Sequence, residues 1–168
     1  MAGILVPVGA SFDSSGGVRR AIERHRADCS AEVHLLHVRI PFSHHVARFI
    51  RSDVRAAHHH AAAERALQPA RALLDQAGVP YVTHVAFGDV AATVASHAQR
   101  LGCRQIVMGL AGGVWGVDAV GDLTVRRIVE LTSVPVEIVR GPARSPFARY
   151  GMPAGIGAML WLLMEAAE

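Results

Sequence analysis

Lysine is absent from this chain of 168 residues, and aromatic residues make up only 5% of it. The formal net charge of +3 therefore comes from arginines, which are scattered along the segments of helical pattern. A surface that binds nucleic acid usually gathers its basic residues on one face, with aromatic side chains among them. Neither feature is present here, so the composition argues against a nucleic-acid-binding protein.

Cysteine is also scarce. Cys29 and Cys103 lack the Cys-x2-Cys spacing of redox and metal sites, which favours reduced thiols over a disulfide framework. Met1–Gly3 lead directly into a strand-like run, without the features of a secretory signal. A chain of this length can bury about 70% of its unfolded surface without covalent cross-links. We therefore expect a cytoplasmic protein with one packed core.

The chain alternates short β-branched runs with longer segments of helical periodicity. The runs at 4–8 and 105–109 each stop at a turn residue, as buried parallel strands do. The pattern predicts four β-α units and a final strand, hence a right-handed, doubly wound parallel α/β sheet. The expected strands are 3–8, 32–38, 80–87, 105–110 and 135–140, and the expected helices are about 17–29, 46–77, 90–101 and 123–132.

Single residues refine this pattern. Asp89 is the expected N-cap of the third helix, and Pro69 lies inside the second helix, which it should kink or split. In an open parallel sheet, ligands bind beyond the carboxyl ends of the strands, where the strand order reverses. A binding site is therefore expected after Val8 and Met108.

After residue 140 a short segment that contains glycine and proline leads into a strongly apolar stretch. We interpret 1–140 as the α/β domain and 141–168 as a linker with an extra apolar C-terminal helix. Met152–Met164 carry no charge but are too few to span a bilayer, which needs about 20 residues. A helix that is apolar on nearly every side is not stable in water. We expect it to pack on protein, across a dimer or against a neighbouring subunit, with membrane-surface attachment as the less favoured alternative.

Five segments resemble the universal stress protein family in their order and spacing, over residues 3–140. These segments are Ile4–Val8, Val33–Val38, Gly88–Ala91, Ile106–Gly109 and Val134–Val139. The resemblance implies a five-stranded, Rossmann-like domain of strand order 3-2-1-4-5 that dimerises and, in one subclass, binds ATP. That subclass carries an Asp directly after the first strand, to hold adenine. After the fourth strand it carries a loop of pattern Gly-x2-Gly-x9-Gly-Ser/Thr, to cradle phosphates.

The sequence departs from the ATP-binding pattern at both places. Gly9 stands where the Asp would be. Gly109 and Gly112 begin the phosphate loop, but Asp122–Leu123 occupy the positions of its last Gly and its Ser/Thr, and Gly121 is one position early. A carboxylate facing phosphate oxygens opposes the binding of a polyanion. The pattern is that of a degenerate nucleotide-binding motif, and we expect no bound cofactor.

The leading interpretation is a non-catalytic stress-response module for binding and signalling, acting as a homodimer without dependence on ATP. In the order 3-2-1-4-5 the last strand is a sheet edge, and an unpaired apolar edge is a liability unless something covers it. The resemblance implies antiparallel pairing of two such edges. The expected dimer residues are Val136, Ile138 and Val139.

The alternative is a nucleotide sensor that binds ATP, AMP or cyclic AMP in the cleft after the first and fourth strands. An apolar adenine slot and main-chain hydrogen bonds from Val38 do not require the missing Asp. The candidate residues of this cleft are Pro7, Val8, Gly9, Val38, Met108, Gly109, Gly112, Gly121 and Asp122. An enzyme of flavodoxin-like fold is disfavoured, because Ser11 lacks a Gly-x-Ser-x-Gly setting and no catalytic group can be assembled.

Ten histidines raise the question of a metal site. Neighbours on a helix point about 100° apart, so His58–His60 cannot direct three imidazoles at one ion. A solvated helix face explains this run and His44–His45 better. His34 and His37 are three apart on a strand and therefore on opposite faces, where we predict hydrogen-bonded interior or rim residues. We predict neither a metal ligand nor a catalytic residue.

Overall fold

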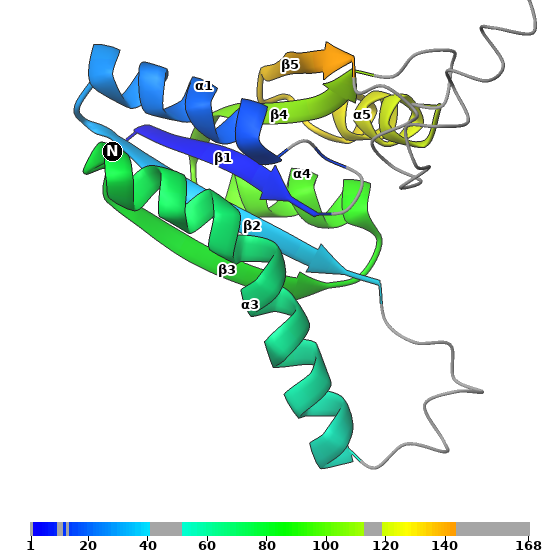
Figure 1. The fold of residues 1–168 in the computed structure, drawn as a ribbon. Coiled ribbons are helices and arrows are strands. Elements are labelled where there is room, and N and C mark those ends of the chain that lie inside the picture. The colour runs from blue at the N-terminus through cyan, green and yellow to red at the C-terminus, as the bar shows by residue number, and fades with distance from the viewer. Residues whose placement is uncertain (1, 10–11, 13, 41–51, 113–118, 144–168) are drawn as a thin grey trace, which may run out of the picture.

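The computed structural model describes residues 2–9, 12, 14–40, 52–112 and 119–143. In this part of the chain five parallel strands form one sheet of order β3-β2-β1-β4-β5, flanked by helices (Figure 1). The predicted doubly wound sheet and its strand order are confirmed. The elements are β1 (Ala2–Val8), α1 (Ser14–Ala27), β2 (Ala31–Arg39), α3 (Ser52–Ala77), β3 (Tyr81–Phe87), α4 (Val90–Arg100), β4 (Cys103–Gly112), α5 (Ala119–Leu131) and β5 (Val136–Ala143).

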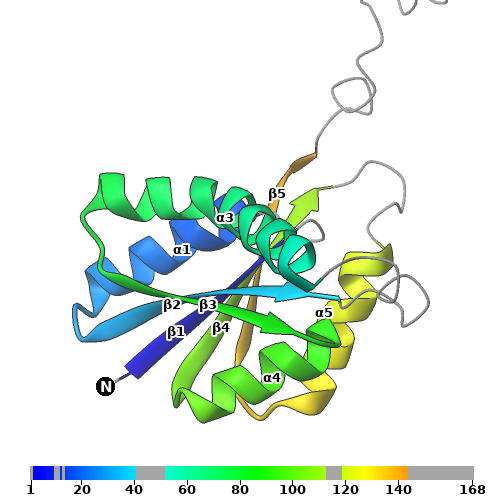
Figure 2. The same cartoon turned by 90° about the horizontal axis from the view of Figure 1, so that it is seen from below.

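The sheet is the middle of three layers. Figure 2 shows α1 and α3 on one face and α4 and α5 on the other. Successive residues of a strand point to opposite faces, so Val6 packs under α1 and α3 while Leu5 packs under α4 and α5. Both side chains are fully buried. The central strands therefore read as continuous apolar runs, because neither face meets water.

Helix boundaries follow the cap residues. The Asp89 carboxylate accepts a hydrogen bond from the backbone N–H of Ala92 at 3.0 Å, which confirms its predicted role as the N-cap of α4. Gly78 and Gly102 follow α3 and α4 with φ of 66° and 62°. This left-handed conformation ends a helix and costs glycine little.

Pro69 does not split the second predicted helix, since α3 runs through it as one helix. Proline removes one helical hydrogen bond, and Pro69 is exposed, so water can satisfy the carbonyl that is left over. Leu67, Ala70 and Leu74 around it are fully buried and hold α3 on the sheet. The expected start of this helix, near Val46, lies outside the described residues.

Two further boundaries differ from the prediction. The last helix begins at Ala119 rather than near Leu123, because Gly121 is accommodated inside α5 instead of breaking it. The last strand continues beyond Arg140 to Ala143, through Pro142. Proline lacks a donor, but a strand at the sheet edge has a side where none is needed. Pro142 is thus compatible with β5.

The predicted C-terminal helix lies in 144–168 and is outside the described residues, as are the side chains of His44–His45 and His58–His60. Among the helices that are described, none combines the length and the apolar character needed to cross a membrane.

Candidate functional site

The carboxyl ends of β1, β2 and β4 meet at one edge of the sheet, as the strand order requires. Val8 pairs in register with His37, and Leu5 with Ile106, which brings Gly109 to the level of Val8. This edge is the predicted cleft.

The structure places the predicted cleft residues as follows. Val8 and Pro7 of β1 are buried, Met108 is fully buried in the core under α4 and α5, and Val38 is partly buried beside that core. Gly112 is the last residue of β4, while Gly121 and Asp122 lie in α5.

His37 ties two of these strand ends together. Its Nδ1 lies 2.8 Å from the carbonyl oxygen of Val8. A carbonyl only accepts, so Nδ1 carries the proton and donates. His37 points to the α1 and α3 side of the sheet, and His34 to the other side, and both are buried. The prediction of two hydrogen-bonded interior histidines on opposite faces is therefore confirmed.

Gly9 stands directly after β1. Among the residues that the structure describes, a Cβ built there would meet one side-chain atom within 4 Å, Cδ2 of Phe12 at 3.8 Å. The backbone turns here through a hydrogen bond from the N–H of Phe12 to the carbonyl of Gly9 at 3.1 Å, and Gly9 does not have the left-handed φ that favours glycine. The described neighbours therefore leave space for a Cβ at this position, and the backbone conformation does not require glycine.

Gly17 of α1 seats that helix on the sheet beside the cleft. A Cβ at this position would lie 2.9 Å from the backbone N of Gly109 and 3.5 Å from the carbonyl oxygen of Val107. Only glycine lets the helix approach β4 this closely. Sequence reasoning treated Gly17 as no more than the start of a helix, because nothing local marks a contact with a strand ninety residues away.

Gly17→Ala is expected to lower the free energy of unfolding by about 1 kcal/mol. Overpacking costs about 1–3 kcal/mol, and alanine returns up to about 1 kcal/mol of helix propensity. Differential scanning calorimetry should show a Tm lower by roughly 2–4 °C. Gly16→Ala is the matched control, because Gly16 is the neighbouring helix residue, is half-buried where Gly17 is buried, and lines the groove beside β5. It should lower Tm less than Gly17→Ala. A Gly17→Ala protein as stable as the wild type would contradict the tight packing.

A second cluster of polar side chains joins α1 to the outer strands. The Glu137 carboxylate of β5 accepts hydrogen bonds from Nε of Arg20 at 2.5 Å, from Nη2 of Arg24 at 3.1 Å and from Nε2 of Gln105 at 2.6 Å. Burial by itself raises the pKa of Glu137, but hydrogen bonds and charges from the two arginines outweigh it and hold the pKa below its ordinary value. Glu137 therefore stays ionised and anchors β5 to α1 and β4.

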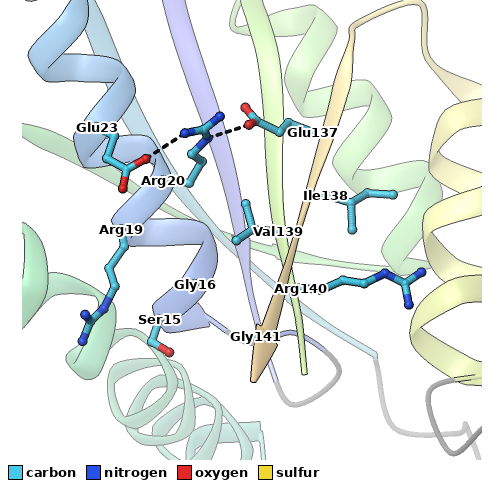
Figure 3. Close-up of a pocket in the computed structure, with 10 residues that line it drawn as sticks. All are labelled: Ser15, Gly16, Arg19, Arg20, Glu23, Glu137, Ile138, Val139, Arg140 and Gly141. Atoms are coloured by element: carbon cyan, nitrogen blue, oxygen red, sulfur yellow. Dashed lines mark hydrogen bonds and ion pairs between the residues drawn. The ribbon is translucent and has the colours of Figure 1, made fainter. Parts of the chain in front are cut away.

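A groove of about 760 Å³ runs between α1 and β5 (Figure 3). Glu137 and Val139 lie toward α1, whereas Ile138 and Arg140 lie toward the opposite side of β5. Ile138 is 43% exposed, while Val136 and Val139 pack partly against the two cores. In the described chain no strand pairs with the outer edge of β5. Sequence reasoning named these three apolar residues and missed the arginines and Glu137 beside them.

The buried cysteine is poorly suited to nucleophilic chemistry. Burial raises the pKa of the Cys103 thiol to about 11, and the exposed Cys29 is a free thiol as well. A thiol with so high a pKa is a weak nucleophile at neutral pH. Among the side chains that the structure describes, no group of three or more His, Cys, Asp or Glu is arranged to hold a metal ion.

Solved structures that are similar to this chain include universal stress proteins. One from Burkholderia pseudomallei is 20% identical with a TM-score of 0.61, covering 82% of this chain and 95% of its own. One from Archaeoglobus fulgidus in complex with dAMP is 18% identical with a TM-score of 0.57, covering 83% and 98%. One from Arabidopsis thaliana with AMP bound is 17% identical with a TM-score of 0.52, covering 92% and 99%. At these identities the likeness establishes the fold alone.

Sequence comparison establishes the family. No curated protein matches the chain. The universal stress protein family model matches residues 2–140, which is more than half of the chain and includes every strand that forms the carboxyl edge. The chain belongs to the universal stress protein family.

Proposed function

We propose that this chain is a non-catalytic stress-response module that acts as a homodimer through β5 and does not depend on ATP. The observation that carries the proposal is the sheet edge at β5. There, the half-exposed Ile138 lies on a strand that has no partner on its outer side in the described chain. An exposed apolar edge of this kind is a template for pairing with another strand. A second copy of the same edge is a suitable partner, because antiparallel pairing of two identical strands is self-complementary.

The groove beside β5 supports the same interface. It leaves room next to Glu137 and Val139, on the α1 side of β5, for side chains of a second strand. Arg20 is already bound to Glu137 and Glu23, so pairing at β5 would not bury an unpaired Glu137. Light scattering on the wild-type protein should therefore give twice the mass of one chain. A monomer at micromolar concentration would overturn this part of the proposal.

Independence from ATP is supported by Gly9 and Asp122. Gly9 offers adenine no carboxylate. Asp122 places a negative charge in the sequence where the ATP-binding subclass has the last glycine of its phosphate loop. Both features weaken the binding of a nucleoside triphosphate.

Thermal unfolding with millimolar MgATP tests this independence. A ligand at one hundred times its Kd adds about 2.7 kcal/mol of stability, which for this chain length raises Tm by roughly 5–11 °C. We expect no shift. A rise above about 5 °C would contradict the proposal.

The variant Gly9→Asp with Asp122→Gly and Leu123→Ser is the matched positive test. It restores both elements of the ATP-binding pattern, and Gly9 imposes no left-handed backbone that an aspartate would strain. We expect MgATP to raise its Tm by about 5 °C. If the variant folds and MgATP does not raise its Tm, Gly9 and Asp122 are not the reason why the wild type does not depend on ATP.

A nucleotide sensor for ATP, AMP or cyclic AMP is the second candidate function. The observation that favours it is the bond between His37 and the Val8 carbonyl, which fixes the strand ends that would border an adenine ring. Two of the similar solved structures contain dAMP and AMP, which is a reason to test those ligands on this chain. Stabilisation of the wild type by AMP or cyclic AMP, without a response to MgATP, would favour this candidate.

A further inference from the structure

Three histidines gather on the face of the sheet that α4 and α5 cover. His34 lies on β2, His84 on β3 and His97 on α4, and we refer to them as the histidine cluster. Ring centroids are 5.3 Å apart for His34 and His84, and 6.4 Å apart for His84 and His97. His34 is 6% exposed and the other two are half-buried. Neither the β5 interface nor the cleft at the strand ends uses this cluster.

The hydrogen bonds of the cluster fix where its protons lie. Nε2 of His84 is 3.3 Å from Nδ1 of His34, and two ring nitrogens can form a hydrogen bond only when one of them carries a proton and the other does not. Nδ1 of His97 is 2.9 Å from the carbonyl oxygen of Thr93, which only accepts. His97 is therefore protonated at Nδ1 when it is neutral.

The charged and titratable groups around the cluster come from three elements. On β2, Oε2 of Glu32 lies 3.8 Å from Nε2 of His34. On α4, Arg100 and His97 both act on His84. On β4, the Cys103 thiol lies next to the His34 ring, since a Cβ at Gly3 would touch both.

These surroundings disfavour a charge on His84. Burial lowers the pKa of His84 most, and the charges of His34, His97 and Arg100 lower it further, while Glu32 opposes them. The neighbouring Cys103 stays an uncharged thiol, because burial raises its pKa to about 11. It therefore offers no negative charge to compensate a second imidazolium.

The cluster accommodates one added proton but not two. A cationic His34 can donate from Nδ1 to His84 and from Nε2 toward Glu32, so the first added proton keeps every hydrogen bond. A second proton, at Nε2 of His84, would place two N–H groups face to face at 3.3 Å. The side-chain hydrogen bond between His34 of β2 and His84 of β3 is then lost. The cationic rings and Arg100 repel one another beneath α4.

We propose that the histidine cluster is an acid-sensitive latch that keeps edge strand β3 and helix α4 closed, and that protonation of His84 opens them. The lowered pKa of His84 sets the direction of the pH dependence. Below about pH 6.5, the unfolded or opened chain takes up a proton at His84, whereas the closed chain disfavours a proton there. The latch therefore contributes fully above that pH and weakens as the pH falls below it.

Hydrogen exchange of the full chain at pH 7.5 and pH 5.5 tests the latch. After correction for intrinsic rates, protection of the amides in Tyr81–Phe87 and Val90–Arg100 should fall by up to about tenfold, because pH 5.5 lies about one unit below the ordinary histidine pKa of about 6.5 that His84 has in the opened chain. Protection of the central strand β1 should change less. An equal change in all three elements, or none, would overturn the proposal.

His84→Gln is the decisive variant, because glutamine can donate to Nδ1 of His34 but cannot take up a proton. It should abolish the selective loss of protection at acid pH. His25→Gln is the matched control: this histidine lies on α1, with Nδ1 2.7 Å from the carbonyl oxygen of Ala31, outside the cluster. It should respond like the wild type. Retention of the selective loss in His84→Gln would refute the latch.

A titration of the wild type by NMR keeps the proposal testable if His84→Gln does not fold. With isotopically labelled histidine, the ring of His84 should titrate below pH 6.5, because its surroundings lower its pKa in the closed chain. The backbone amide signals of β3 and α4 should change at the same midpoint. Titration of His84 without any change in those amides would contradict the latch.

Discussion

Ile138→Arg should convert the proposed β5 dimer into a monomer, so that the mass seen by light scattering falls by half. In a pair of antiparallel β5 strands, Ile138 of one chain is covered by β5 of the other chain. A guanidinium at this position would lose its water without gaining a counter-charge, because Glu137 is already engaged by Arg20 and Arg24. Burial of an unpaired charge costs several kcal/mol, which is enough to dissociate a micromolar dimer. Analytical ultracentrifugation over a range of concentrations measures the change.

Val85→Arg is the matched control for this experiment. Val85 is 45% exposed against 43% for Ile138, and it also lies on an edge strand, β3, at the opposite end of the sheet. A protein that dimerises through β5 tolerates arginine at Val85 and stays a dimer. If Ile138→Arg remains a soluble dimer, or if Val85→Arg is the variant that dissociates, the β5 interface is wrong.

The sheet was predictable from sequence because its signals are local. β1 and β4 are buried on both faces and read as unbroken apolar runs, and Asp89, Gly78 and Gly102 mark helix ends with side-chain or backbone chemistry that needs no tertiary context. The family resemblance supplied the strand order. Boundaries were missed where an element runs through a local breaker, as α5 does through Gly121 and β5 through Pro142.

The sites were less predictable because they depend on contacts between distant residues. The Arg20 and Glu137 pair is separated by 117 positions, and the His34 and His84 pair by 50. The interior setting of His34 and His37 followed from strand periodicity, whereas their partners did not. Gly17 shows the same limit, since its requirement for glycine comes from the backbone of β4.

Glu137 connects the stability of the fold to the β5 interface. It holds β5 through hydrogen bonds from α1 and from β4, and its side chain is 20% exposed. Arg20 and Arg24 are 39% and 47% exposed, so water and salt screen their charges. The contribution of this cluster is therefore smaller than that of a fully buried ion pair.

Glu137→Gln is expected to lower the free energy of unfolding by about 2 kcal/mol at pH 7, because the amide places a donor against the donors of Arg24 and Gln105. The corresponding fall in Tm is roughly 4–8 °C. Glu23→Gln is the control: Glu23 is 62% exposed and binds only Nη1 of Arg20 among the contacts described, so its loss should cost less than about 0.5 kcal/mol.

Acid pH should remove the difference between the wild type and Glu137→Gln. The pKa of Glu137 is lowered in the folded chain, so its stabilisation is fully present above the ordinary value of about 4.3 and is lost as the pH falls through the folded pKa. Tm measured from pH 7 to pH 3 should converge for the two proteins below about pH 4. This window lies below that of the histidine cluster, which acts under about pH 6.5, so the two effects separate on one titration. A gap that persists unchanged at pH 3 would show that the packing of residue 137, and not its charge, secures β5.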